Sequence, residues 1–172
     1  DSAVARDEGF KVPLSAPTGA TLGPATATGT IRTDDSLLSI AATDPKGVPK
    51  HEANAGSTPF TFTVTRTGDL RNECNVGYFI TGSGTNPTNA ADFAASAALT
   101  GNLTFAANEF TKVITAEVAG DSTFEADETF AVTLINPTVG TLGTVSAIGT
   151  IKNDDSGLSI SPTSVVKAEG NS

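Results

Sequence analysis

The chain has 172 residues, of which 38% are hydrophobic, and it contains no Met and no Trp. This length corresponds to one to one and a half ordinary domains, with enough apolar residues for a core. Because 19 acids outnumber 10 bases and give a net charge of −9, we expect neither nucleic acid nor an anionic membrane surface as a partner. No window holds the roughly 18 apolar residues of a membrane span, which predicts no direct membrane insertion.

Residues 1–35 open the chain with a segment that returns later. Shifted by 120 positions, residues 1–36 align with residues 121–156 without a gap, and 19 of the 36 positions are identical. Among the retained positions are alternate apolar residues, namely Phe10, Val12 and Leu14 in the first copy and Phe130, Val132 and Leu134 in the second. A period of two with one fixed face is typical of a half-buried strand. We therefore interpret residues 1–35 as the C-terminal part of a preceding repeat.

Residues 36–155 form one complete repeat, in which alternation predicts seven strands separated by Gly, Pro, Asn and Asp. They are expected at residues 37–42, 58–66, 75–81, 102–106, 110–119, 129–136 and 145–153. Their apolar faces predict a core that includes Phe60, Phe62, Val64, Ile114, Phe130, Val132 and Leu134. Seven short alternating strands in about 120 residues are typical of an all-β antiparallel sandwich.

Residues 156–172 begin a further repeat, because the Leu-Ser-Ile of residues 38–40 recurs at residues 158–160. We expect one strand here. Neither partial repeat has enough strands to close a core of its own. The chain starts without Met and in the middle of a repeat, so we expect a processed product or a piece of a longer protein.

Acidic residues gather in the connections after the first, third, fifth and seventh strands of the complete repeat. In a sandwich whose strands alternate in direction, these four connections share one end. Carboxylates brought together repel unless a cation compensates them, and a hard cation such as Ca2+ is bound by six to eight oxygens. Some of these acids could instead cap turns, and for Asp127 and Asp155 the two interpretations stay open.

The segments "GDSTFEADETFAVTL" and "GTIKNDD", preceded by "EANAG" and "FTVTRTG", resemble the Calx-beta family. The resemblance covers the complete repeat and both partial ones. It implies immunoglobulin-like repeats of the kind found in sodium–calcium exchangers and in large extracellular bacterial proteins. It also implies a Ca2+ site whose ligands, carried over to this sequence, are Glu52, Asp92, Asp121, Glu125, Glu128, Asp154, Asp155 and the backbone carbonyl of Thr123.

Three positions depart from the pattern of strong calcium binders. Gly120 and Ser122 stand where those members carry a run of aspartates, and Asn153 replaces a third terminal aspartate. We therefore expect fewer ions, bound more weakly, than in a regulatory sensor. The upstream copy has Ala5 where Glu125 stands, so its site is expected to be weaker still.

No motif for catalysis is found. The chain has one Cys, Cys74, and one His, His51, with no Ser-His-Asp set, phosphate loop or zinc spacing, so we expect no enzyme and interpret Cys74 as a small strand residue. We expect a structural module of a bacterial tandem-repeat protein that is extracellular or lies at the cell surface: an adhesin, stalk or surface filament. Its partners would be neighbouring repeats, or identical chains in a fibre. The alternative is a calcium-sensing regulatory module of a membrane transporter.

Overall fold

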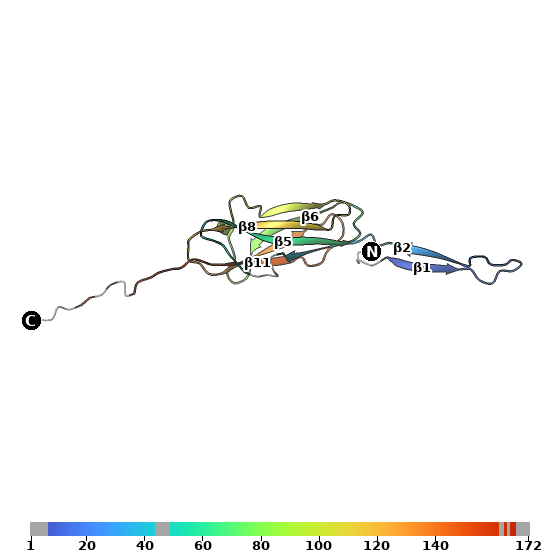
Figure 1. Ribbon diagram of the computed structural model, residues 1–172, viewed down its shortest axis with the longest axis horizontal. Helices are drawn as coiled ribbons and strands as arrows, with labels where there is room; N and C mark the ends of the chain where they lie inside the picture. Colours follow the sequence, from blue (N-terminus) through green and yellow to red (C-terminus); the bar gives the residue numbers. More distant parts are fainter. Residues whose placement is uncertain (1–6, 44–48, 162–163, 165, 168–172) are drawn as a thin grey trace, which may run out of the picture.

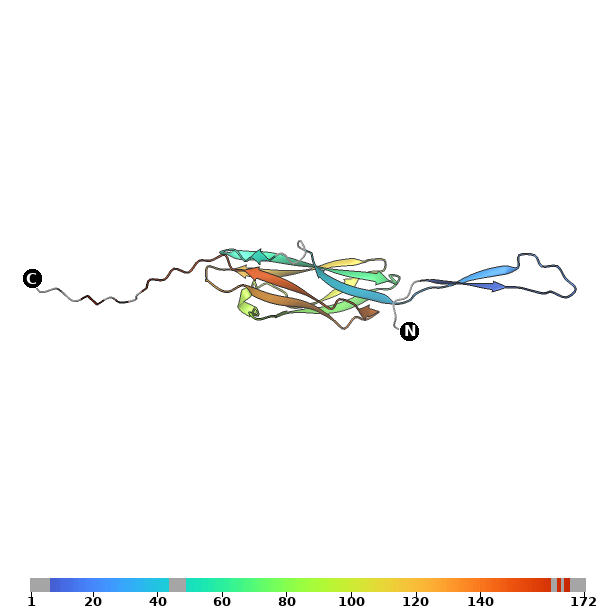
Figure 2. The ribbon, with the colours of Figure 1, turned by 90° about the horizontal axis from the view of Figure 1, so that it is seen from below.

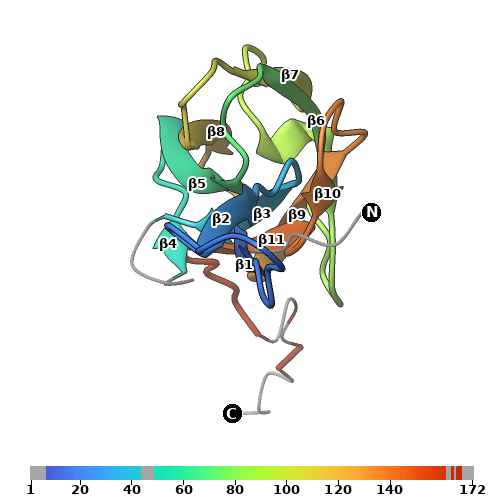
Figure 3. The same ribbon diagram turned by 90° about the vertical axis from the view of Figure 1, so that its right-hand side faces the viewer.

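A computed structural model describes residues 7–43, 49–161, 164 and 166–167, and its central part consists of two β-sheets that pack face to face (Figures 1 and 3). One sheet has the order β10 (Thr141–Leu142), β3 (Ser36–Ala42), β5 (Gly56–Gly68) and β8 (Thr111–Gly120). The other has the order β4 (Lys50–His51), β11 (Ser146–Lys152), β9 (Glu128–Ile135), β6 (Cys74–Gly82) and β7 (Thr100–Phe105). The predicted all-β sandwich is confirmed, and all seven predicted strands are present.

The core forms where the alternating apolar faces of the two sheets meet. Along β5, Phe60, Phe62 and Val64 point inward between threonines that face outward. The ring of Phe130 on β9 packs edge-on against Phe60, Phe62 and Phe93, with centroids 5.5, 5.8 and 5.3 Å away. Every residue predicted for the core is buried. Alternation identified this core because a strand turns successive side chains to opposite faces.

Two short strands and one helical turn were not predicted. Strand β10 pairs with β3, and β4 pairs with β11, and both pairings are parallel. The other pairings between the sandwich's described strands are antiparallel. The 3-10 turn η2 (Ala90–Asp92) lies in the long connection between β6 and β7. No helix in the described part of the chain has the length and apolar character needed to cross a membrane.

Within the segment interpreted as the end of a preceding repeat, β1 (Glu8–Pro13) and β2 (Thr26–Ile31) form a hairpin, which is a separate two-stranded sheet. It extends from one end of the sandwich along the long axis, while the segment after Asp155 leaves the opposite end (Figures 1 and 2). Of the segment expected to hold the first strand of a further repeat, residues 156–161, 164 and 166–167 are described and carry no strand, and the others lie outside the described residues. The molecule is consequently elongated.

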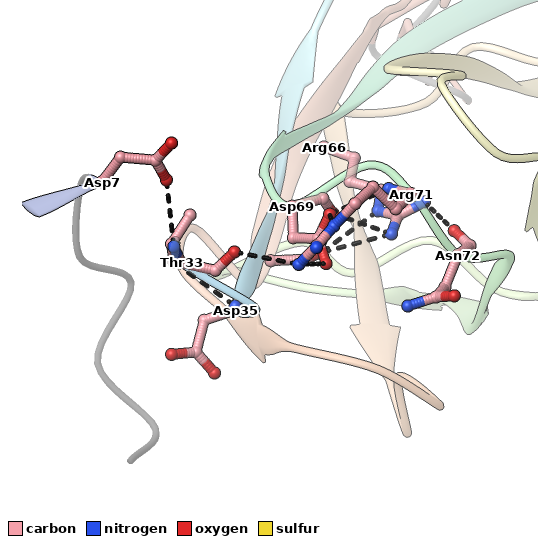
Figure 4. A network of polar contacts seen from close by, with 8 residues as sticks. Asp7, Thr33, Asp35, Arg66, Asp69, Arg71 and Asn72 are labelled. Atoms are coloured by element: carbon pink, nitrogen blue, oxygen red, sulfur yellow. Dashed lines mark hydrogen bonds and ion pairs between the residues drawn. The ribbon is translucent and has the colours of Figure 1, made fainter. Parts of the chain in front are cut away.

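A polar network ties β3 to the loop between β5 and β6 (Figure 4). The guanidinium group of Arg66, at the end of β5, is buried and donates hydrogen bonds to Ser36 Oγ, the Asp69 carbonyl and the Asn72 carbonyl. Beside it, Arg71 forms an ion pair with Asp69, with an Nε–Oδ1 distance of 2.8 Å. This pairing lowers the pKa of Asp69 to about 2.

The same network reaches the linker between the hairpin and the sandwich. Arg71 Nη2 donates to the Thr33 carbonyl at 3.2 Å, and the backbone N–H of Asp69 donates to the Asp35 carbonyl at 2.8 Å. Asp7, directly before β1, accepts a hydrogen bond from the backbone N–H of Thr33 at 3.0 Å. The hairpin therefore joins the sandwich through a hydrogen-bonded linker.

Candidate metal centre

Carboxylate side chains converge at the end of the sandwich where the chain leaves β11. They come from the residue after β4, from η2, from the connection between β8 and β9, from the first residue of β9, and from the residues after β11. Among the described residues, two groups of three acids have oxygen atoms within 4.8 Å of one another. The groups are Glu52, Asp154 and Asp155, and Asp92, Glu125 and Glu128.

Glu52 is the most buried member of the first group, with only 5% of its surface exposed. Its backbone is fixed on both sides: the N–H donates to the Lys152 carbonyl at 3.4 Å, and the carbonyl accepts from Thr58 Oγ1 at 2.7 Å. Burial and the nearby charges of Asp121, Glu125, Asp154 and Asp155 raise the pKa of Glu52 to about 7. A carboxylate in this position lacks a compensating positive charge.

Asp155 provides the clearest sign that a ligand is needed. Its Oδ1 accepts a hydrogen bond from Asn54 Nδ2 at 2.6 Å, whereas its Oδ2 is buried and has no hydrogen-bond partner. Leaving a buried carboxylate oxygen unpaired is costly. A cation held between Asp155, Glu52 and Asp154 would satisfy this atom, so the residues present fit a bound metal ion.

The second group is organised by local backbone hydrogen bonds. Asp92 lies at the end of η2, where its Oδ2 accepts from the backbone N–H of Asn89 at 2.5 Å. The backbone N–H of Glu125 donates to Asn153 Oδ1 at 3.0 Å, which holds the connection between β8 and β9 against the end of β11. Glu128 is the first residue of β9. Three separate elements therefore bring their carboxylates to one place.

The second group is also strained electrostatically. Burial, the charge of Asp92 and a hydrogen bond shared with its carboxylate raise the pKa of Glu128 to about 7, with smaller contributions from Glu125 and Glu52. Burial and the charges of Asp121, Asp92 and Asp155 also raise the pKa of Glu125. Each group thus feels the charges of the other, and the two behave as one acidic site.

Two of the residues implied by the resemblance lie outside both groups. Asp121 Oδ1 accepts a hydrogen bond from the backbone N–H of Thr123 at 2.6 Å, which makes a local turn, and both residues are exposed. Asp121 still raises the pKa of Glu52 and Glu125 through its charge. Asp127 forms an ion pair with Lys152, which lowers its pKa, so of the two open cases Asp127 pairs with a lysine while Asp155 joins the carboxylates.

Two amides at the site were not among the predicted ligands. Asn54 bonds the Asp155 side chain, and Asn153 links the Glu125 backbone to the Asp155 carbonyl, which its Nδ2 reaches at 2.7 Å. The sequence signal for both was proximity: Asn54 lies two residues after Glu52, and Asn153 directly precedes the terminal aspartates. A prediction based only on charged residues does not identify neutral side chains that orient the carboxylates.

Residues 48–155 match the family model of the Calx-beta domain. The chain belongs to the Calx-beta family. This domain is a non-catalytic module. The crystal structure of the apo-form Calx CBD1 domain is 25% identical with a TM-score of 0.55, and the match covers 71% of this chain and 100% of that one. This similarity confirms the predicted immunoglobulin-like sandwich. No curated protein sequence matches the chain.

Two further Calx-beta structures extend beyond the region shared with this chain. CBD12 from CALX1.2 is 28% identical with a TM-score of 0.55, over 69% of this chain and 46% of that chain. The calcium binding domain CBD12 of CALX1.1 is 27% identical with a TM-score of 0.53, over 70% and 44%. The chain therefore spans less than half the length of either CBD12 structure.

One departure from the strong calcium binders has a steric reason in this Calx-beta domain. A Cβ atom at Gly120 would lie 2.3 Å from the Ala53 carbonyl oxygen and 3.0 Å from that of Glu52. Ala53 itself has a φ of 77°, in the left-handed region that residues other than glycine rarely adopt. The loop that carries Glu52 thus lies directly against the end of β8, and no side chain fits at position 120.

Proposed function

We propose that the chain is a non-enzymatic structural module of a tandem-repeat extracellular protein, and that it binds calcium weakly at its C-terminal end. The observation that carries the proposal is the unpaired Asp155 Oδ2 within six convergent carboxylates. Oxygen-rich sites of this kind suit Ca2+. The position supports a structural role, because the site lies where the chain leaves the sandwich, which is where a following repeat would begin.

The calcium site would act by removing repulsion. Without an ion, the carboxylates of the two groups disfavour the close packing of their loops. With Ca2+ bound, the loop of residues 120–128 and the residues after β11 are held together, and the path of the chain into the next repeat becomes fixed. Weak binding suits an extracellular setting, where modules typically have dissociation constants of about 10⁻⁴–10⁻³ M.

A second function, a calcium-sensing regulatory module of a transporter, is favoured by the similarity to the Calx structures, one of which is a calcium binding domain. The two functions differ in the affinity they require, since intracellular sensors bind at about 10⁻⁷–10⁻⁵ M. Isothermal titration with calcium separates them. Titration in the sensor range would favour the transporter module over the structural one.

Thermal melting of the full chain, with about 5 mM calcium and with chelator, tests calcium binding itself. Binding to the folded state alone would stabilise it by about 1–2 kcal/mol at that concentration, which corresponds to a rise in Tm of roughly 4–8 °C. The double variant Glu52→Gln with Glu128→Gln removes one charge from each group while keeping side-chain shape. It should lose most of the shift.

The matched control is Glu73→Gln, because Glu73 is exposed, precedes β6 and lies outside both carboxylate groups. This variant should keep the full calcium shift. Equal melting temperatures for the unsubstituted chain with calcium and with chelator would overturn calcium binding and leave a plain spacer module.

A further inference from the structure

The β1–β2 hairpin is a second copy of the hairpin formed by β9 and β11. Phe10 pairs with Gly29 in the first, and Phe130 pairs with Gly149 in the second, at the same register. A Cβ atom at Gly29 would lie 2.3 Å from Phe10 Cζ, and one at Gly149 would lie 2.4 Å from Phe130 Cζ. In both hairpins, the phenylalanine ring therefore covers the glycine that faces it on the neighbouring strand.

The two hairpins differ in what covers their apolar face. Phe130, Val132 and Leu134 are fully buried in the sandwich, whereas their counterparts Phe10, Val12 and Leu14 are 50%, 51% and 61% exposed. Ile31, the counterpart of the buried Ile151, is also exposed. A contiguous exposed apolar face of this kind marks an interaction surface.

Within the sandwich, strand β3 pairs with the connection between β9 and β11. Thr141 and Leu142 pair in parallel with Leu37 and Leu38. The backbone N–H of Gly143 donates to the Leu38 carbonyl at 2.8 Å. The next bond along runs the other way, from the Ile40 N–H to the Thr144 carbonyl at 3.0 Å. Leu38 and Ile40 then point into the core.

The chain carries a second segment of the β3 type that has no such pairing. Residues 158–160 repeat the Leu-Ser-Ile of β3, and Leu158 and Ile160 are almost completely exposed. The hairpin and this segment lie at opposite ends of the long axis (Figure 2). They do not meet within this structure, so the complementary segment that this chain carries can reach the hairpin only from a second copy.

We propose that residues 157–160 of a second copy of the chain add to the β1–β2 hairpin, in the register that β3 takes against β10. By the 120-residue offset, Thr21 and Leu22 pair in parallel with Gly157 and Leu158. Two backbone hydrogen bonds follow, from the Gly23 N–H to the Leu158 carbonyl and from the Ile160 N–H to the Pro24 carbonyl. Strand addition of this kind combines main-chain hydrogen bonds with side-chain contacts.

The apolar contacts and the symmetry follow from this register. In the sandwich, Leu38 and Ile40 belong to the same buried core cluster as Val132 and Leu134. Leu158 and Ile160 would, in the same way, bury apolar surface together with Val12 and Leu14. Because the two contacting surfaces differ, the contact is head-to-tail. Because they lie at opposite ends of the long axis, we expect an open linear assembly rather than a ring. The proposal rests on the proposed structural function, in which modules are joined end to end, and it specifies the contact between two of them. It does not require calcium.

Sedimentation equilibrium of the full chain in chelator, from dilute to concentrated solution, tests the proposal. The average mass should rise with concentration well beyond that of a monomer. The tail variant Leu158→Asp with Ile160→Asp and the hairpin variant Val12→Asp should each stay monomeric. All three substituted residues are exposed, so the sandwich remains folded. Ser159→Asp and Lys11→Asp are the matched controls and should associate like the unsubstituted chain.

Mixing the two blocked variants gives the sharpest outcome. One retains a working hairpin and the other a working tail, so their mixture should form dimers and nothing larger. If the unsubstituted chain stayed monomeric at every concentration, the proposal would be overturned. Association of the tail variant alone would also overturn it, because it would mean that hairpins pair with each other. Because calcium is absent throughout, failure here would leave the calcium-dependent melting shift unaffected.

Discussion

Phe130 and Phe10 occupy equivalent positions in the two hairpins, but only Phe130 is covered by a second sheet. In the sandwich its ring makes edge-on contacts with three phenylalanines and covers Gly149. In the hairpin, Phe10 keeps the contact with its glycine but lacks the three rings. Comparing the two residues therefore separates the stability that comes from burial in the core from the stability that comes from the contact within the hairpin.

Truncation of these two rings should have unequal effects. Phe130→Ala is expected to lower the free energy of unfolding by about 3–5 kcal/mol, because it opens a cavity in the core. Phe10→Ala should leave the unfolding of the sandwich unchanged, within about 0.5 kcal/mol. Urea denaturation at low protein concentration measures both. A loss below about 1 kcal/mol for Phe130→Ala would contradict its placement.

Glu52 and Glu128 make the stability of the calcium-free protein depend on pH. Their pKa values rise from 4.5 to about 7 in the folded chain. The folded state therefore binds more protons than the unfolded state between these pH values, so the free energy of unfolding should fall as pH rises from about 4.5 to 7. Denaturant melts across this range, in chelator, measure the fall.

Calcium and substitution are the controls for this pH dependence. Bound Ca2+ keeps the carboxylates ionised and lowers their pKa values, so the decrease should disappear with calcium present. It should be much smaller in Glu52→Gln with Glu128→Gln, because neither amide titrates and only the raised pKa of Glu125 remains. A stability that stays flat across the range for the unsubstituted chain in chelator would contradict the electrostatic account of the site.

At the level of single elements, the end of β5 depends on a buried cation. Arg66 reaches three acceptors that belong to β3 and to the loop before β6. A lysine has one point of charge rather than a planar fork of donors, so it cannot serve all three. Arg66→Lys should therefore destabilise the sandwich by at least about 2 kcal/mol, since buried carbonyls lose their donor.

Arg32 offers the matched control for this substitution, because it lies exposed in the linker after β2. Arg32→Lys should change the free energy of unfolding by less than about 0.5 kcal/mol. If both substitutions had the same small effect, the guanidinium of Arg66 would not be needed to anchor the loop.

The elements also show what alternation can and cannot predict. The seven long strands were predictable, because each has enough residues for a period of two to appear. Strands β4 and β10 have two residues each, which is too short for any period, and only tertiary pairing defines them. The burial of Arg66 was not predictable either, since an arginine at a strand end reads as exposed.

The acidic site was predictable in place but not in detail. Counting the connections was enough to bring Glu52, Asp92 and Asp155 to one end of the sandwich. The division into two groups, and the turn that keeps Asp121 apart from them, depend on the loop conformation between β8 and β9. That conformation is set by single hydrogen bonds such as Asn153 to the Glu125 backbone, which no sequence pattern encodes.

At the scale of the whole molecule, the two ends of the sandwich should respond differently to calcium. The carboxylate groups lie at the C-terminal end, and the hydrogen-bonded linker to the hairpin lies at the other. Hydrogen–deuterium exchange should show slower exchange in residues 120–128 and 152–156 when calcium is added. Exchange in β1 and β2 should not change, and equal slowing at both ends would contradict a single site.

The two parallel pairings have a mechanical consequence. Strands β3 and β4 belong to the N-terminal side of the repeat, β10 and β11 belong to its C-terminal side, and each short pairing joins one of each. When the sandwich is pulled through the linker before β3 and the segment after β11, which leave it at opposite ends (Figure 1), parallel partners are drawn past each other lengthwise. Their hydrogen bonds are then loaded together, in shear, rather than opened one after another. The two short pairings thus act as a clamp against extension, and the force that the sandwich resists depends on how slowly it unfolds.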